Sequence, residues 1–428
     1  MIVTINPSLI SGNVHAPASK SSMQRACAAA LISNRETIIS NAGKSNDDLA
    51  AIEVIKKLGA TVTFKNDKLL VRGSDFKNIS REINCGESGL GLRMFAPIAA
   101  LSHHEILLNG SGSLLQRPMD FFDEIFPQLG ISIQSNNGKL PIKIKGPLQP
   151  GNITIDGSLS SQFLTGLLMA YAKACTAPVT IQVQNLTSKP YIDLTLNVLE
   201  HFGWHIENRN YAEFHFDPNV SKVSPTWGDL EGASYTVEGD WSGASFLLVV
   251  SAISGNVNVE GLDMESAQAD KAIIQALQLA GAQISFNANK ISVNARNLKG
   301  FDFDATDCPD LFPPLVALAA YCNGITHIKG VNRLAHKESN RGLSLQEEFT
   351  KMNLKVLLNG DIMTIESNGQ PIGAVVHSNH DHRIAMACAV AALKADGPTT
   401  IHSAEAIDKS YPDFYDHLKM LNASLQIT

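Results

Sequence analysis

The sequence predicts an α/β (α+β) fold in which two similar domains are each made of three repeats. The chain has 428 residues, which is more than one hydrophobic core usually serves, so two domains of about 200 residues are expected. A polar start followed by a helix of small apolar residues recurs six times along the chain. A short β-type run follows each of these helices, which predicts a strand after every one.

The six predicted helices share a start rich in Ser, Gly or Asp and a body of Ala, Leu and other apolar residues. They begin near Lys20, Ser88, Ser160, Ser242, Pro309 and Asp381. The strand-like runs after them occupy residues 36–43, 104–112, 179–186, 257–262, 325–331 and 399–405. Each repeat is therefore expected to begin with a helix followed by a strand.

Five of the repeats continue with a second amphipathic helix and two alternating strands joined by an Asn, Gly or Asp turn, which indicates a hairpin. These hairpins are predicted at residues 60–73, 131–146, 204–216, 282–293 and 354–367. The sixth repeat ends in a single strand, ASLQIT, while residues 1–7 and 12–18 form two strands without local partners.

The simplest closure pairs the two ends of the chain. The N-terminal strands then belong with the C-terminal half, and the chain crosses between domains near residues 18 and 238. We therefore expect one domain of residues 1–18 plus 239–428 and a second of residues 19–238.

Composition and charge exclude several functional classes. The net charge of −7 disfavours nucleic-acid binding, which needs a basic surface. No basic leader and no apolar run of about 18 residues is present, so we expect a cytoplasmic protein without a membrane span. The six cysteines form no CxxC pair and the histidines follow no metal-ligand pattern, so neither a metal nor a cofactor is expected.

Cationic side chains gather in or near the polar helix starts. The first turn of a helix carries unpaired N–H groups and partial positive charge, so several such starts facing one cleft favour anions. Ordinary helix caps are the alternative interpretation of the same pattern. The cations are Lys20, Arg25, Arg93, Lys337, Arg341, Arg383 and Lys409, of which Arg93 is interpreted as a structural partner.

A set of motifs in this order resembles the 5-enolpyruvylshikimate-3-phosphate synthase family over almost the whole chain. The motifs are 17-PASKSSMQR-25, 116-QRPM-119, 156-DGSLSSQFLTGLLM-169, 188-SKPYIDLTL-196, 238-EGDWSGAS-245, 309-PD-310, 337-KESNR-341, 381-DHRIAM-386 and 409-KSYPDF-414. The resemblance implies two domains of three βαβαββ units each, with the active site in the cleft between them. It also implies phosphoenolpyruvate and shikimate 3-phosphate as substrates. We expect a monomer.

The resemblance implies a binding site for shikimate 3-phosphate. Within it, Ser160, Ser161 and Ser188 would hold the phosphate, and Ser21 and Arg25 the carboxylate. The remaining residues of this site would be Lys20, Gln162, Tyr191, Asp310 and Lys337, with Tyr191 orienting the ring and Gln162 between the two substrates.

The phosphoenolpyruvate site implied by the resemblance is strongly cationic, as a phosphate and a carboxylate on three carbons require. Its residues would be Lys20, Gly89, Arg117, Gln162, Arg341, His382, Arg383 and Lys409. At Gly89 the backbone would approach the ligand so closely that a side chain would obstruct it.

The implied reaction needs an acid and a base. By resemblance, Asp310 would remove the proton of the attacking hydroxyl, and Glu338 and Lys20 are the alternatives for donating and recovering a proton at C3 of phosphoenolpyruvate. Because cations lower the pKa of a neighbouring carboxyl group, the position of Glu338 between Lys337 and Arg341 disfavours its role as a proton donor.

One segment departs from the family pattern. Residues 85–95 read CGESGLGLRMF, with Glu87 and Leu90 where the family usually has Asn and Thr. This change predicts lowered sensitivity to glyphosate, which the family binds in the phosphoenolpyruvate site. Two alternative functions are an enolpyruvyl transferase acting on UDP-N-acetylglucosamine and a non-catalytic anion-binding relative.

Overall fold

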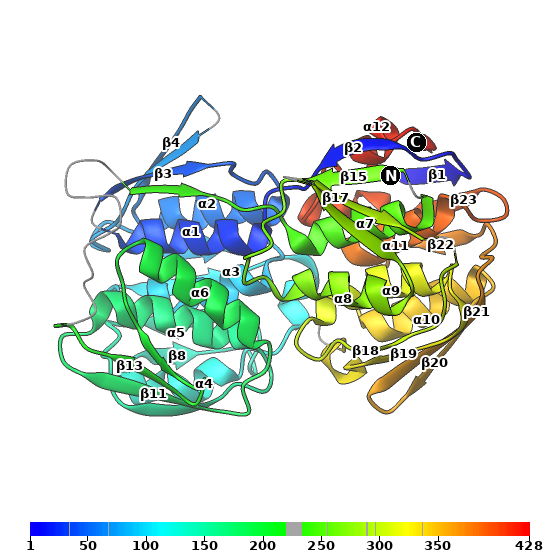
Figure 1. The fold of residues 1–428 in the computed structure, drawn as a ribbon. Coiled ribbons are helices and arrows are strands. Elements are labelled where there is room, and N and C mark those ends of the chain that lie inside the picture. The colour runs from blue at the N-terminus through cyan, green and yellow to red at the C-terminus, as the bar shows by residue number, and fades with distance from the viewer. Residues whose placement is uncertain are drawn as a thin grey trace. The chain divides into compact units, whose positions relative to one another are not determined.

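The computed structural model describes residues 1–33, 35–66, 68–219, 233–254, 256–287, 290–295, 297–335 and 337–428. Chain contacts divide it into two compact units (Figure 1). Unit 1 contains Met1–Ser19 and Glu238–Thr428, and unit 2 contains Lys20–Val237. Within the described ranges, no helix is both long and apolar enough to cross a lipid bilayer.

Unit 2 has a core of helices packed on one another, with sheets outside them (Figure 1). The helices that begin its repeats are α1 (Lys20–Ile32), α3 (Gly89–Ala99) and α5 (Ser161–Ala174). The second helices are α2 (Asn46–Lys57), α4 (Phe121–Ile125) and α6 (Lys189–His201). All of α3 and nearly all of α1 is buried, because apolar or small side chains occupy nearly every face of both helices, the pattern of a helix surrounded by other elements.

Each sheet of unit 2 has four strands, of which the first two are parallel and the others antiparallel. The first sheet has the order β14 (Ala233–Thr236), β3 (Glu36–Ser40), β5 (Lys68–Arg72) and β4 (Thr61–Lys65). The second has the order β6 (Glu82–Asn84), β7 (Glu105–Asn109), β9 (Ile142–Lys145) and β8 (Ser132–Gln134). The third has the order β10 (Ile153–Asp156), β11 (Val179–Gln184), β13 (Glu213–Phe216) and β12 (Glu207–Arg209).

Unit 1 repeats this plan. Its first helices are α7 (Trp241–Ser254), α9 (Phe312–Ala319) and α11 (His382–Ala392), which pack on one another. Its second helices are α8 (Ile273–Leu279), α10 (Arg341–Lys351) and α12 (Phe414–Met420).

The sheets of unit 1 also have four strands each, and the N-terminal segment contributes to two of them. One has the order β16 (Gln283–Asn287), β17 (Lys290–Asn294), β15 (Val257–Glu260) and β2 (Gly12–His15). Another has the order β18 (Asp302–Asp304), β19 (Asn323–Lys329), β21 (Ile362–Asn368) and β20 (Lys355–Asn359). The last has the order β22 (Val375–His377), β23 (Thr399–His402), β1 (Ile2–Asn6) and β24 (Ser424–Ile427).

Strand β1 takes the place that a hairpin strand occupies in the other sheets. Val3 is paired with Ile401 of β23 on one side and with Ile427 of β24 on the other. The side chains of Val3 and Ile5 are fully buried, so both ends of the chain contribute to one core.

The predicted mixed α/β fold is confirmed, and the five predicted hairpins are present. Turn residues of two of them, 67 and 288–289, lie outside the described residues. Reading the residues alone did not identify most of the short strands that precede the first helices. Strand β6, for example, has only three residues, too few to display a period of two.

The contact between α3 and α5 depends on a glycine. A Cβ atom on Gly166 would lie 2.5 Å from the carbonyl oxygen of Arg93 and 2.9 Å from that of Met94, both in the facing helix. Backbone oxygens cannot move away as a flexible side chain can, so a larger residue would push the helices apart.

We expect Gly166→Ala to lower the free energy of unfolding by about 1–3 kcal/mol through this overpacking. Urea denaturation followed by circular dichroism measures the change. Gly151→Ala is the matched control, because a Cβ atom there meets nothing within 4 Å, and it should shift the free energy by less than about 1 kcal/mol. Equal stabilities of the two variants would contradict the close contact.

Candidate active-site clusters

Several serines predicted as phosphate ligands lie at helix starts in unit 2. The Ser160 hydroxyl oxygen accepts a bond of 3.3 Å from the backbone N–H of Gln162, so this side chain caps α5. A capping hydroxyl accepts one bond and keeps a proton to donate, so the cap is compatible with anion binding. Ser161 is buried in the first turn, and Ser188 precedes α6 with a left-handed backbone, φ 56°.

Arg25 is almost completely buried in α1. Its Nη1 donates to the carbonyl oxygen of Ser21 at 2.8 Å, and its Nη2 donates to that of Tyr191 at 3.2 Å. The guanidinium carbon also lies 6.0 Å from the centre of the Tyr191 ring. The structure thus brings together three residues predicted to hold shikimate 3-phosphate: Ser21, Arg25 and Tyr191.

Gly89 leaves room for Arg117. A Cβ atom on Gly89 would lie 2.5 Å from Nη1 of Arg117, whose Nη2 donates to the Ser113 hydroxyl at 3.4 Å. The same hydroxyl donates to the carboxylate of Glu87 at 3.2 Å. Glu87, one of the two residues that depart from the family pattern, therefore shares Ser113 with a predicted phosphoenolpyruvate ligand.

Gln162 is oriented by Arg93, the arginine that sequence analysis interpreted as structural. Nη1 of Arg93 donates to Oε1 of Gln162 at 2.9 Å, and Nη2 donates to the Pro118 carbonyl oxygen at 3.3 Å. The guanidinium carbon of Arg93 lies 4.9 Å from the centre of the Phe163 ring. Arg93 thus links α3 to the start of α5 and holds the Oε1 end of the Gln162 amide.

Lys20 lies in a partly buried acidic environment that sequence analysis missed. Its Nζ is 2.9 Å from Oδ2 of Asp47, and Asp47 is nearly buried. The neighbouring Asp48 accepts bonds from the backbone N–H and hydroxyl of Ser45, forming a capping box at the start of α2. Burial raises the pKa of Asp48 to about 6, against the opposing effects of Ser45 and of the Lys20 charge.

In unit 1, Asp310 is surrounded by cations. Its Oδ1 lies 3.2 Å from Nζ of Lys337 and 2.8 Å from Nη1 of Arg341, and its Oδ2 lies 3.1 Å from Nη2 of Arg383. Asp310 belongs to the short 3₁₀ helix η4 (Pro309–Leu311) that precedes α9, whereas the three cations lie at or near the starts of α10 and α11. The fold therefore brings Asp310, Lys337 and Arg341 of the fifth repeat next to Arg383 of the sixth.

The charges around Asp310 determine its protonation. Burial alone would raise the pKa of this carboxyl group, but Arg383, Lys337 and Arg341 outweigh burial and hold it well below its usual range. Burial lowers the pKa of Lys337, although the negative charge of Asp310 opposes this effect. Asp310 is consequently ionised at neutral pH.

Arg341 is the centre of this cluster. Its guanidinium is 1% exposed and contacts Glu338 at 2.6 Å through Nη2 and Asp381 at 3.0 Å through Nε, in addition to Asp310. Asp381 is fully buried, and its Oδ1 accepts the backbone N–H of Arg383 at 3.0 Å, which caps α11. No role was predicted for Asp381 from the sequence, although a capping aspartate directly before His382 and Arg383 is a detectable signal.

The other predicted phosphoenolpyruvate ligands of unit 1 are also buried. Lys409 ends the 3₁₀ helix η6 (Ala404–Lys409), which packs against α11. His382 has a side chain only 1% exposed, with Nδ1 3.9 Å from Oδ1 of Asp381. Their roles as phosphoenolpyruvate ligands stay predictions.

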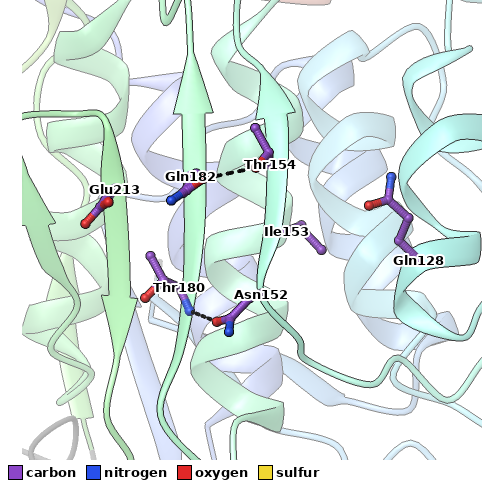
Figure 2. Close-up of a pocket in the computed structure, with 7 residues that line it drawn as sticks. All are labelled: Gln128, Asn152, Ile153, Thr154, Thr180, Gln182 and Glu213. Atoms are coloured by element: carbon purple, nitrogen blue, oxygen red, sulfur yellow. Dashed lines mark hydrogen bonds between the residues drawn. The ribbon is translucent and has the colours of Figure 1, made fainter.

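A separate hollow lies on the third sheet of unit 2. Figure 2 shows Thr154 bonded to Gln182 and Asn152 bonded to the backbone of Thr180 across β10 and β11. The hollow has a volume of about 540 Å³, and Gln128, Ile153 and Glu213 complete its lining. None of the residues predicted for either substrate lines it.

Comparison with known proteins identifies relatives along the whole chain. Residues 5–418 match the family model described as EPSP synthase (3-phosphoshikimate 1-carboxyvinyltransferase). A 3-phosphoshikimate 1-carboxyvinyltransferase of Clostridium kluyveri is 34% identical over 424 residues, covering 99% of this chain and 98% of its own. One of Clostridium perfringens (strain SM101 / Type A) is 35% identical over 427 residues, covering 99% of both.

Solved structures share the fold. An EPSP synthase from Acinetobacter baumannii superposes with a TM-score of 0.81 at 24% identity, covering all of both chains. The enolpyruvyl transferase NikO from Streptomyces tendae superposes with a TM-score of 0.79 at 17% identity, covering 100% of this chain and 98% of its own. At these identities the structures support the architecture alone.

The raised pKa of Asp48 predicts how stability changes with pH. Between the unfolded pKa of about 3.9 and the folded value of about 6, the folded chain keeps a proton that the unfolded chain releases. The contribution of this group to the free energy of unfolding therefore falls by about 3 kcal/mol as pH rises through this window.

We expect Asp48→Asn, which cannot titrate, to gain stability relative to the unchanged protein by up to that amount between pH 4 and pH 7. Urea denaturation at several pH values measures the difference. Glu53→Gln, an exposed change on the same helix, is the control and should leave the pH dependence unaltered. A constant difference between Asp48→Asn and the unchanged protein at all pH values would contradict the prediction.

Proposed function

Because the chain belongs to the EPSP synthase family, we propose that it transfers the enolpyruvyl group of phosphoenolpyruvate to shikimate 3-phosphate and releases phosphate. The 5-hydroxyl of shikimate 3-phosphate attacks C2 of phosphoenolpyruvate, while the hydroxyl loses its proton and C3 gains one. The tetrahedral adduct then loses a proton from C3 and phosphate from C2, which leaves the enolpyruvyl ether.

The observation that best supports this assignment, beyond family membership, is the contact of Asp310 with three cations. An ionised carboxylate is the form that a general base requires. The cations reduce its basicity, and anionic substrates that bind to them would offset this reduction. Arginine has five N–H donors. Arg341 uses four of them on Asp310, Glu338 and Asp381, so a substrate anion would meet the second proton of its Nη1. Arg383 donates to Asp310 through Nη1 and Nη2 and has further donors for an anion.

We assign the substrate sites as the resemblance implied. For shikimate 3-phosphate the residues are Lys20, Ser21, Arg25, Ser160, Ser161, Gln162, Ser188, Tyr191, Asp310 and Lys337. For phosphoenolpyruvate they are Lys20, Gly89, Arg117, Gln162, Arg341, His382, Arg383 and Lys409. The burial of Arg25 and Arg117 supports the assignment, because an anion bound to them would be shielded from water and its attraction to the guanidinium strengthened.

Lys20 and Glu338 remain the two candidates for proton transfer at C3. Glu338 forms an ion pair with Arg341 at 2.6 Å, and Lys20 forms one with Asp47 at 2.9 Å. Each candidate is therefore paired with an opposite charge in the structure. A carboxyl group so close to a guanidinium is stabilised in its ionised form. This contact favours Lys20 as the donor and Glu338 as the group that recovers the proton.

The test is phosphate release by the purified protein given phosphoenolpyruvate with shikimate 3-phosphate, and in parallel with UDP-N-acetylglucosamine. We expect release with shikimate 3-phosphate alone, together with formation of its enolpyruvyl ether by mass spectrometry. Release with the sugar nucleotide alone would assign the alternative acceptor. Absence of release with both would favour a non-catalytic anion-binding protein.

Substitution of the proposed acid–base groups should separate chemistry from binding. We expect Asp310→Asn and Glu338→Gln each to lower kcat by about 10²- to 10⁴-fold, the range for a positioned proton-transfer group. Asp304→Asn removes an exposed ion pair with Lys329 in the same unit and should leave kcat within about twofold. Near-normal turnover of either active-site variant would remove that residue from the mechanism.

A further inference from the structure

Arg25 lies where three helices of unit 2 meet, and two threonines accept hydrogen bonds from its guanidinium. Its Nε donates to Oγ1 of Thr195 on α6 at 2.9 Å, and its Nη2 lies 3.5 Å from Oγ1 of Thr165 on α5. The two hydroxyl oxygens are 3.1 Å apart, and both threonines are fully buried. The guanidinium of α1 is therefore held by hydroxyl groups from two other helices.

The direction of each bond follows from the number of available protons. The Thr195 hydroxyl donates its single proton to the carbonyl oxygen of Tyr191 at 2.8 Å, one helical turn earlier. In the 3.1 Å contact between the two hydroxyl groups, the Thr165 hydroxyl must therefore be the donor and the Thr195 oxygen the acceptor. Both lone pairs of Thr195 are thereby engaged, one by Thr165 and the other by Nε of Arg25.

This arrangement leaves little freedom to the guanidinium. The hydroxyl of Thr195 cannot rotate without losing its bond to Tyr191, and its Cβ branch restricts χ1 in a helix. Tyr191 in turn accepts from both Thr195 and Nη2 of Arg25. The Thr195 hydroxyl is therefore held in place by Tyr191, and through its bond to Nε it orients the plane of the Arg25 guanidinium.

We propose that Thr195 is a positioning residue that orients the guanidinium of Arg25 for the carboxylate of shikimate 3-phosphate. This inference rests on the proposed function, in which Arg25 binds that carboxylate. A charge-assisted hydrogen bond from arginine to a carboxylate depends on the direction of the guanidinium plane, so a loss of orientation weakens binding of this substrate while the charge stays present.

Thr195→Val keeps the shape of the side chain and removes the hydroxyl. It leaves Nε of Arg25 without its acceptor, and a hydrogen bond to a charged group corresponds to about ten- to hundredfold in affinity. We expect the Kd for shikimate 3-phosphate by calorimetry and its KM to rise by that factor. The KM for phosphoenolpyruvate should change by less than about threefold, because Arg25 does not bind it.

Three further variants keep the test interpretable. Thr195→Ser retains the hydroxyl and should restore binding to within about threefold. Thr37→Val removes a buried hydroxyl of the same unit that has no hydrogen-bond partner among the described residues, and it should not alter either KM. Thr165→Val keeps the acceptor for Nε but removes the bond to Thr195 and the long 3.5 Å contact with Nη2, and it should weaken binding by about two- to tenfold.

A double-mutant cycle shows whether Thr195 acts through Arg25. In an Arg25→Ala background, Thr195→Val should weaken binding of shikimate 3-phosphate by less than about twofold further. The proposal would be overturned if Thr195→Val weakened binding of shikimate 3-phosphate equally in both backgrounds, or if it left binding unchanged in the otherwise unaltered protein. The proposed function would still stand in either case, provided that the unchanged protein turns over. Absence of turnover and of binding by the unchanged protein would overturn both. If Thr195→Val does not fold, Thr165→Val with the same cycle decides the question.

Discussion

The buried guanidinium of Arg341 is the charge on which the arrangement of unit 1 depends. Removing a guanidinium from water costs several kcal/mol unless carboxylates and hydrogen bonds replace the solvent. Arg341 obtains them from Asp310, Glu338 and Asp381, which come from different parts of the chain. The helix starts of α9, α10 and α11 must therefore meet, and this requirement places Asp310 next to Arg383 and Lys337 as well.

In unit 2, neutral oxygen atoms replace the water around a buried guanidinium. Arg25 is as deeply buried as Arg341, and hydroxyl and carbonyl groups of α1, α5 and α6 accept its protons. Such groups orient a guanidinium and carry no net charge of their own. The two buried arginines thus differ in the groups that the structure describes as accepting their protons.

Close packing of helices allows both arrangements. Glycines and other small residues let the helix backbones approach until side chains from neighbouring helices reach the same guanidinium, as the contact of Gly166 with α3 illustrates. Gly89 serves a related purpose, because a larger residue there would displace Arg117. Packing and charge placement are consequently linked, and a change in one is expected to disturb the other.

Site residues that stand in a recognisable motif were predicted from the sequence, whereas the residues that hold them in place through hydrogen bonds or ion pairs were not. Lys20, Arg25, Asp310, Arg341 and Arg383 stand in motifs at helix starts. Asp47, Asp381 and Thr195 also stand near helix starts or on helices, but each acts by contacting a residue 27 to 170 positions away. No local pattern encodes a contact of that separation, so these roles appear only in three dimensions.

The sequence by itself determined the repeated helix-and-strand plan, the α/β class and the family, because periodicity, turn residues and motifs are properties of neighbouring residues. The pairing of the two chain ends was expected from the sequence, whereas tertiary structure alone decided the register of β1 against β23 and β24 and the ionised state of Asp310. It also decided the orientation of Arg25. The physical reason is that strand pairing and electrostatic interactions depend on distances in space, which order along the chain does not specify.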